Sequence, residues 1–209
     1  MSKRKLKPES KKKIIIGAGA VALLLLLIII FLALGSCNKS EAGVPTLTIE
    51  TPQKLSIAQA KEFTLDVSVS TLGDSLYPAA SMSIAFDPTR LEFLGIEEGN
   101  VLVLSDSGNV AQKLPQWSCN PEQCNKTGKI NLMYLDTTGG RNAFSKNLLN
   151  ENDNVIVRLK LRLRGSARSG DAYDLIFEDA VFAASDEAQS LAMTTASLKT
   201  KNGKIVVGE

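Results

Sequence analysis

Apolar and polar side chains alternate along several stretches of the chain that follow Pro45. In residues 62–70 one phase is apolar and the other polar, and residues 154–164 repeat this pattern. A period of two is typical of strands that bury one face and expose the other. Further runs of strand type cover residues 46–50, 79–86, 91–97, 129–135, 173–182, 191–198 and 204–207.

Gly, Pro, Asn and Asp separate these runs, at residues 71–74, 87–88, 98–100, 137–141 and 201–203. These residue types mark turns. The chain shows no convincing amphipathic helix, apart from one helical turn that we expect within residues 145–150. About nine short strands therefore predict an all-β fold in which two sheets pack face to face.

The N-terminal part of the chain has a different composition. Residues 14–36 form an uncharged, mostly apolar run that is long enough to cross a membrane as a helix. Residues 1–13 carry seven of the 24 basic and one of the 22 acidic residues, so residues 38–209 carry 17 basic and 21 acidic ones. This asymmetry predicts a cytoplasmic N-terminus and an exported body. The body is mildly acidic overall, and nothing in it suggests nucleic-acid binding, which requires a clustered basic face.

Two kinds of membrane attachment fit these residues. In the first, residues 14–36 remain as an uncleaved signal anchor. In the second, residues 34–37 (Leu-Gly-Ser-Cys) resemble a bacterial lipobox, so that Cys37 would become a lipidated N-terminus. Against the second, the apolar run exceeds the roughly 7–15 residues of typical signal peptides. In both, residues 37–45 are a linker, and the domain of residues 46–209 faces the extracytoplasmic side of the cell membrane.

The candidate chemistry of the body is sparse. Cys119 and Cys124 lie in the sequence Cys-Asn-Pro-Glu-Gln-Cys, where Asn-Pro favours a turn, and we expect a local disulfide in an exported domain. Two cysteines without any histidine are too few for a typical zinc site, and no metal or other cofactor is predicted. Aspartates at 136 and 171–174 lie in loops, but neither loop has the spacing of a calcium site. The absence of histidine excludes a histidine-based triad, and nothing else in the chain points to an enzyme.

One motif stands at the end of a predicted strand. Phe86 faces the core, Asp87 accepts N–H bonds in the turn, Pro88 fixes φ, and Leu91 re-enters the core. The pattern Phe-Asp-Pro-x-x-Leu-x-Phe resembles the signature of cohesin domains, the receptor modules of cellulosome scaffolds. Residues 130–140, 155–164 and 199–208 resemble later parts of the same family in order and spacing. The resemblance implies a nine-stranded jelly-roll sandwich over residues 46–208.

The resemblance also implies a non-catalytic function. Cohesins bind the dockerin module of a partner through one sheet face, in surface assembly or polysaccharide degradation. In that family the strand before the Asp-Pro turn supplies polar contacts, so Ser81 and Ser83 are the expected contacts here; the alternative is that they form an ordinary solvated strand face. A second candidate is the basic stripe in which Arg158 and Arg162 flank Lys160. It would receive an acidic partner, or else protect the sheet from aggregation.

Two further functions fit an exported sandwich. A carbohydrate-binding module stacks sugars on exposed aromatic rings, and Trp117 is the candidate for such a platform. The alternative for Trp117 is a cap that packs on the predicted disulfide. A structural part of an envelope assembly needs no site at all. The sequence therefore predicts a dockerin-like protein partner first, with polysaccharide binding and a structural role as alternatives.

Overall fold

The computed structural model describes residues 43–104, 110–113, 117–149, 152, 154–185 and 197–208. The predicted basic region, the membrane segment, Cys37 and most of the strand predicted at 191–198 lie outside these residues. Within the described ranges, no helix is both long and apolar enough to cross a membrane. Residues 43–209 form a compact unit of their own.

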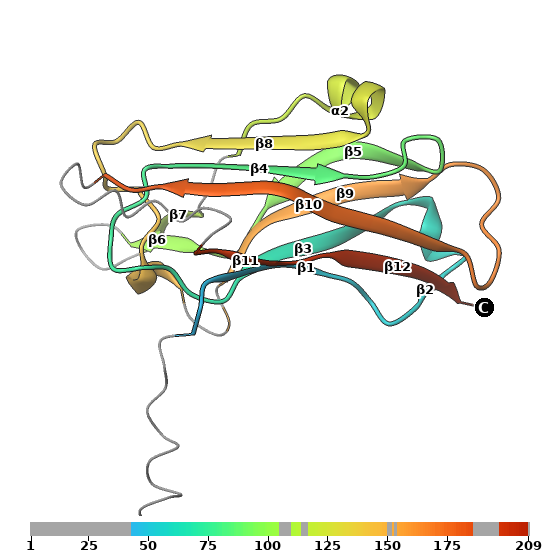
Figure 1. Ribbon diagram of the computed structural model, residues 1–209, viewed down its shortest axis with the longest axis horizontal. Coiled ribbons are helices and arrows are strands. Elements are labelled where there is room, and N and C mark those ends of the chain that lie inside the picture. The colour runs from blue at the N-terminus through green and yellow to red at the C-terminus, as the bar shows by residue number, and fades with distance from the viewer. Residues whose placement is uncertain are drawn as a thin grey trace, which may run out of the picture. The chain divides into compact units, whose positions relative to one another are not determined.

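The domain consists mainly of two five-stranded sheets, which lie face to face (Figure 1). The first has the strand order β11 (Lys199–Lys201), β1 (Thr46–Glu50), β3 (Phe63–Val69), β9 (Val155–Leu163) and β5 (Leu91–Glu98). The second has the order β2 (Leu55–Ser56), β12 (Gly203–Gly208), β10 (Ala172–Ala183), β4 (Ala79–Ala85) and β8 (Lys129–Leu135). The pairs β1–β11 and β2–β12 are parallel and the other pairs in these sheets are antiparallel. Strands β6 (Leu102–Leu104) and β7 (Val110–Lys113) form a separate hairpin.

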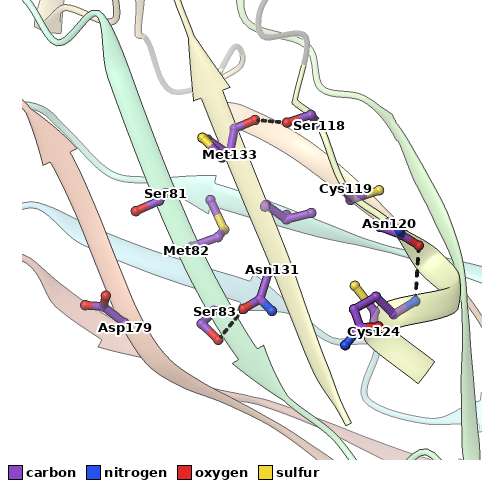
Figure 2. Close-up of a pocket in the computed structure, with 12 residues that line it drawn as sticks. Ser81, Met82, Ser83, Ser118, Cys119, Asn120, Cys124, Asn131, Met133 and Asp179 are labelled. Carbon is purple, nitrogen blue, oxygen red and sulfur yellow. Dashed lines mark hydrogen bonds between the residues drawn. The ribbon is translucent and has the colours of Figure 1, made fainter. Parts of the chain in front are cut away.

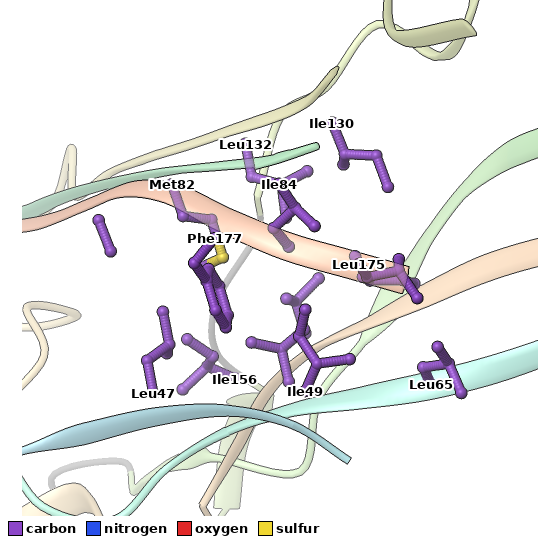
Figure 3. Close-up of a cluster of buried hydrophobic side chains, with 14 of the residues drawn as sticks. Leu47, Ile49, Leu65, Met82, Ile84, Ile130, Leu132, Ile156, Leu175 and Phe177 are labelled. Atoms are coloured by element: carbon purple, nitrogen blue, oxygen red, sulfur yellow. The ribbon is translucent and has the colours of Figure 1, made fainter. Parts of the chain in front are cut away.

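The core lies between the sheets and follows the predicted alternation (Figure 3). In β3, Leu65 and Val67 are buried, and in β4 the same holds for Met82 and Ile84. In these strands one phase faces the opposite sheet, since successive side chains of a strand point to opposite faces. The predicted two-sheet sandwich of the jelly-roll type is confirmed for the described residues, which form twelve strands instead of about nine.

The turn after β4 has the predicted structure. The Asp87 carboxylate accepts hydrogen bonds from the N–H and the hydroxyl of Thr89, at 2.9 and 2.6 Å. These bonds lower the pKa of Asp87, because they favour its ionised form. Phe86 and Leu91 are buried on either side of the turn. The motif therefore joins two sheets: β4 belongs to one and β5 to the other.

The structure also contains helices that the sequence pattern only partly indicates. A 3-10 turn at Lys146–Leu148 confirms the helical turn expected there, and a second one covers Gln59–Lys61. Helix α2 (Pro121–Thr127) was not predicted. Asn120 caps its start by accepting the N–H of Gln123, and Gly128 ends it in the left-handed conformation, at φ +70°. The Asn-Pro pair thus starts a helix, whereas we expected a tight turn.

Candidate functional site

The outer face of β8, β4 and β10 forms a shallow trough. The outward side chains of the central strand β4 are all small: Ala79, Ser81, Ser83 and Ala85. Residues of both neighbours stand opposite them, so that Ser83 lies between Asn131 and Asp179, Ser81 between Met133 and Val181, and Ala79 between Leu135 and Ala183. Larger side chains on β8 and β10 therefore rise on both sides of a low floor. We refer to these nine residues and Ala85 as the trough.

Two hollows lie along the trough. The larger, of about 490 Å³, is bounded by the polar part of the trough and by segment 118–124, which lies beyond the edge strand β8 (Figure 2). The smaller, of about 200 Å³, lies over the part with Ala79, Leu135 and Ala183. Ser81 lines both hollows and Ser83 the larger one. The structure therefore brings the two predicted contact residues together on one concave surface.

Exposed apolar side chains gather at the trough and beside it. Met133 and Leu135 of β8 are 61% and 65% exposed, and Ile176 of β10, which stands opposite Ala85, is 46% exposed. Met133 and Leu135 are next to each other on the outward phase of β8, and neighbouring apolar groups that are this accessible are typical of protein-binding surfaces. The sequence reasoning did not select these residues, although β8 alternates in a way that places Met133 and Leu135 on the outward phase.

A β-bulge in β10 determines the charge of the trough. The pairing of β10 with β4 shifts between Phe177 and Asp179, so both Glu178 and Asp179 are exposed. Glu178 forms an ion pair with Lys129, at 2.8 Å, whereas Asp179 stands opposite Ser83 and lines the larger hollow. Among the described residues, none forms an ion pair or side-chain hydrogen bond with the Asp179 carboxylate. In the part of the chain that the structure describes, this carboxylate of the trough therefore has no ionic partner.

Segment 118–124 is held at its start by Ser118, which bonds β8, and at its end by the next residue, Asn125, which bonds β5. Ser118 pairs with Met133 through two backbone hydrogen bonds of 2.7 and 3.1 Å, and its hydroxyl also donates to the Met133 carbonyl. In α2 the Asn125 side chain bonds both backbone groups of Phe93 in β5, at 2.8 and 2.9 Å. The wall that this segment adds to the larger hollow is therefore held by the edges of two different sheets.

The predicted disulfide between Cys119 and Cys124 is not formed in the structure. Both residues are free cysteines; Cys124 is buried and Cys119 is partly exposed beside the larger hollow. The prediction rested on a turn at Asn120-Pro121, and the start of α2 replaces that turn. Burial, together with the neighbouring Cys124, raises the pKa of the Cys119 thiol, so this group stays protonated at neutral pH.

Trp117 is not a sugar-binding platform. Its side chain is only 7% exposed, and its indole N–H donates to the Ile156 carbonyl at 3.0 Å. Its ring centroid lies 5.9 Å from that of Tyr134 and 6.1 Å from that of Phe144. Burial also raises the pKa of Tyr134 to about 12. Trp117 therefore belongs to an aromatic cluster of the core, and it is not a cap on a disulfide either.

The basic stripe lies on the other sheet and is paired with carboxylates. Arg158 contacts Asp66 at 3.0 Å, Lys160 contacts Glu62 at 2.6 Å, and Arg162 contacts Glu92 at 2.7 Å. The hydrogen bond from Arg162 lowers the pKa of Glu92, and the one to Glu62 raises the pKa of Lys160. Asp66 lies on β3, Glu62 directly precedes that strand, and Glu92 lies on β5, so the acids flank β9 on both sides. The stripe therefore fits the second interpretation, protection and cross-strand stabilisation of a sheet face.

Three comparisons place this architecture among known proteins. Residues 46–207 match the family model of the cohesin domain. The third cohesin ScaC of Acetivibrio cellulolyticus, solved in complex with the ScaB dockerin, has a TM-score of 0.55 at 15% identity over 79% of this chain and 99% of that chain. The sixth cohesin of scaffoldin B from the same organism, in complex with the Cel5 dockerin, has a TM-score of 0.55 at 18% sequence identity and covers 79% of this chain and 99% of that chain. The OlpA cohesin in its complex with Doc918, from Clostridium thermocellum, has a TM-score of 0.53 at 16% sequence identity and covers 78% of this chain and 96% of that chain.

These matches define the fold of the domain. At such identities they carry no individual contact residue across. A search of curated proteins gave no match. Within the part of the chain that the structure describes, no group of three or more Asp, Glu, Cys or His side chains is placed to hold a metal ion.

Proposed function

Because the chain belongs to the cohesin family, we propose that its domain binds a dockerin-type protein partner through the trough of β8, β4 and β10. The observation that carries this proposal is the concave surface itself, in which exposed Met133 and Leu135 stand beside a floor of small side chains. Similar folds have been solved with dockerins bound. The proposed role is recognition without catalysis.

A protein partner fits the trough better than a polysaccharide does. Flat sugar binding relies on exposed aromatic rings, and all the aromatic residues on β8, β4 and β10 that the structure describes are buried: Tyr134, Tyr173, Phe177 and Phe182. Trp117 is buried as well. Aliphatic and thioether side chains such as Met133 instead adapt to the apolar side chains of a protein.

Substitution of Met133 by aspartate tests this proposal. We expect Met133→Asp to weaken partner binding roughly 30-fold, because a charge would be buried at the centre of the interface without a counter-ion. Isothermal titration calorimetry with the purified domain of residues 43–209 measures the dissociation constant. The probes are the ScaB and Cel5 dockerins together with every dockerin module encoded in the same genome.

Ile57→Asp is the matched control. Ile57 is 47% exposed, comparable to Met133, but lies outside the trough, so we expect its variant to bind like the unmodified domain. Equal losses in both variants would indicate a general effect of the added charge. If no dockerin module binds the unmodified domain, the proposed function is wrong.

We further propose that residues 14–36 anchor the domain outside the cytoplasmic membrane as an uncleaved signal anchor. The support is the long apolar run with basic residues on its N-terminal side only. Cys37→Ser is then expected to change the mass of the protein only by the difference between a cysteine and a serine side chain, and to leave its recovery in the membrane fraction unchanged. Metabolic labelling with a fatty acid, followed by intact-mass spectrometry, checks this. Lipid incorporation that disappears in the variant would instead establish the lipoprotein.

A further inference from the structure

The trough changes character along the direction of its strands. At one end Leu135, Ala79 and Ala183 form an apolar row, followed by Met133 and Val181 on either side of Ser81. Toward the other end a row consists of Asn131, Ser83 and Asp179, and the Ser83 hydroxyl donates to the Asn131 amide oxygen at 2.9 Å. Beyond this row, Ala85 lies between Lys129 and Ile176. Figure 2 shows this polar row, with Asp179 and Asn131 on the two strands that flank Ser83.

The charge at the polar end is concentrated in one group. Lys129 and Glu178 neutralise each other in an ion pair of 2.8 Å. Asp179 is exposed, lines the larger hollow and has no ionic partner among the described residues. A partner that covers the hollow would remove water from this carboxylate, which costs free energy unless the partner supplies a positive charge.

The register gives the spacing that the partner must match. Four residues of β4 separate Ala79 from Ser83, and four residues of β8 separate Leu135 from Asn131. At about 3.3 Å per residue, the apolar and polar rows are about 13 Å apart. An α-helix that lies along the strands rises about 1.5 Å per residue, so about 13 Å corresponds to roughly nine residues. The nearest position on the same face of the helix is eight residues away, at about 12 Å.

We propose that the trough selects a helix with an apolar anchor at one position and Lys or Arg about eight residues away, and that it binds this helix in one direction only. The apolar anchor lies over the row of Leu135, and the cation lies over Asp179. The reversed helix would place the cation on the apolar row and leave Asp179 without a counter-ion. This inference rests on the proposed function of the trough, and it adds the partner's charge, spacing and direction.

A displayed library tests the inference. The probe is the ScaB dockerin displayed on yeast, in which one exposed helix carries a Leu as the apolar anchor. The positions eight residues before and eight residues after this Leu are each varied among Lys, Glu and Ser. Sorting on the domain of residues 43–209 is expected to enrich Lys over Glu roughly tenfold on one side of the anchor only. The side on which enrichment occurs gives the direction of the helix.

Variants of the domain assign the preference to one carboxylate. Asp179→Lys is expected to reverse the preference to Glu at the same position, and Asp179→Asn to abolish it. Asp174→Lys is the matched control: Asp174 is exposed on the same strand but lines neither hollow of the trough, so Lys should remain preferred.

The possible failures are distinguishable. If the selected binders show no charge preference at the varied positions, or if Asp179→Lys leaves that preference unchanged, the inference is overturned and the proposed function stays intact. Equal enrichment of Lys on both sides of the anchor overturns the single direction. A library without binders, alongside dockerins that also fail in calorimetry, overturns the proposed function and the inference together.

Discussion

Trp117→Ala is expected to lower the free energy of unfolding by about 4 kcal/mol, since removal of a large buried aromatic side chain leaves a cavity. The indole packs against Tyr134 and Phe144, and its N–H bonds the Ile156 carbonyl at 3.0 Å. The variant loses the ring contacts and leaves a buried carbonyl without this donor. Urea unfolding followed by far-ultraviolet circular dichroism measures the effect, because Trp117 is the single tryptophan of the chain and fluorescence is lost with it.

Trp117→Phe separates packing from hydrogen bonding. It keeps an aromatic ring in the cluster but removes the indole N–H, and we expect a loss of about 2 kcal/mol. In the unmodified domain, tryptophan emission should shift to longer wavelength when urea exposes the indole to water. Emission typical of a water-exposed indole before urea is added, together with a loss below about 1 kcal/mol in Trp117→Ala, would contradict the burial of Trp117 and restore the sugar-platform hypothesis.

Strands were predictable because their signal is local. In β8 each residue's burial follows from its phase, and in β3 the exception is the buried Ser68. The predicted runs 46–50 and 129–135 coincide with β1 and β8. The Asp-Pro turn was equally predictable, since Asp87 bonds the Thr89 two residues away. Such features depend on neighbours in sequence and require no knowledge of the other sheet.

Helix α2 was missed although its capping signals stand in the sequence. Seven residues, Pro121–Thr127, are too few to display a helical period of about 3.6. Asn120, Pro121 and Gly128 nevertheless occupy the N-cap, the first helical position and the C-cap. Reading Asn-Pro as a turn also led to the expected disulfide, which the structure does not contain, because the expected proximity of the thiols depended on that turn.

The candidate site was only half predictable, since it depends on distant pairings. Ser81 and Ser83 were selected through the family resemblance. Asp179 was not, because the bulge that moves it to the outward phase has no evident signature in the sequence. Similarly, Arg158 and Arg162 looked like a free cationic stripe until β3 and β5 placed Asp66 and Glu92 beside them. Long-range register therefore decided that Arg158 and Arg162 are paired with carboxylates and that Asp179 has no ionic partner among the described residues.

Asn125→Leu is expected to destabilise the domain by about 3 kcal/mol, the second largest effect on folding. The Asn125 carboxamide accepts the Phe93 N–H at 2.9 Å and donates to the Phe93 carbonyl at 2.8 Å, so it pairs with β5 as another strand would. These contacts occur where the pairing of β5 with β9 shifts, between Phe93 and Gly95. Leucine keeps the branch at Cγ and the number of side-chain heavy atoms but leaves two backbone groups without these partners, each at a cost of about 1–3 kcal/mol.

Two further variants make this result specific to the carboxamide. Asn125→Asp keeps the acceptor for the Phe93 N–H but loses the donor, and we expect about half the effect. Lys126→Ala, at the neighbouring exposed position of α2, should change the free energy of unfolding by less than about 0.5 kcal/mol. Urea titrations with unchanged m-values give these differences directly. If Asn125→Leu were as stable as Lys126→Ala, α2 would not be held to β5 by this side chain, and the wall of the larger hollow would depend on Ser118 and Met133 alone.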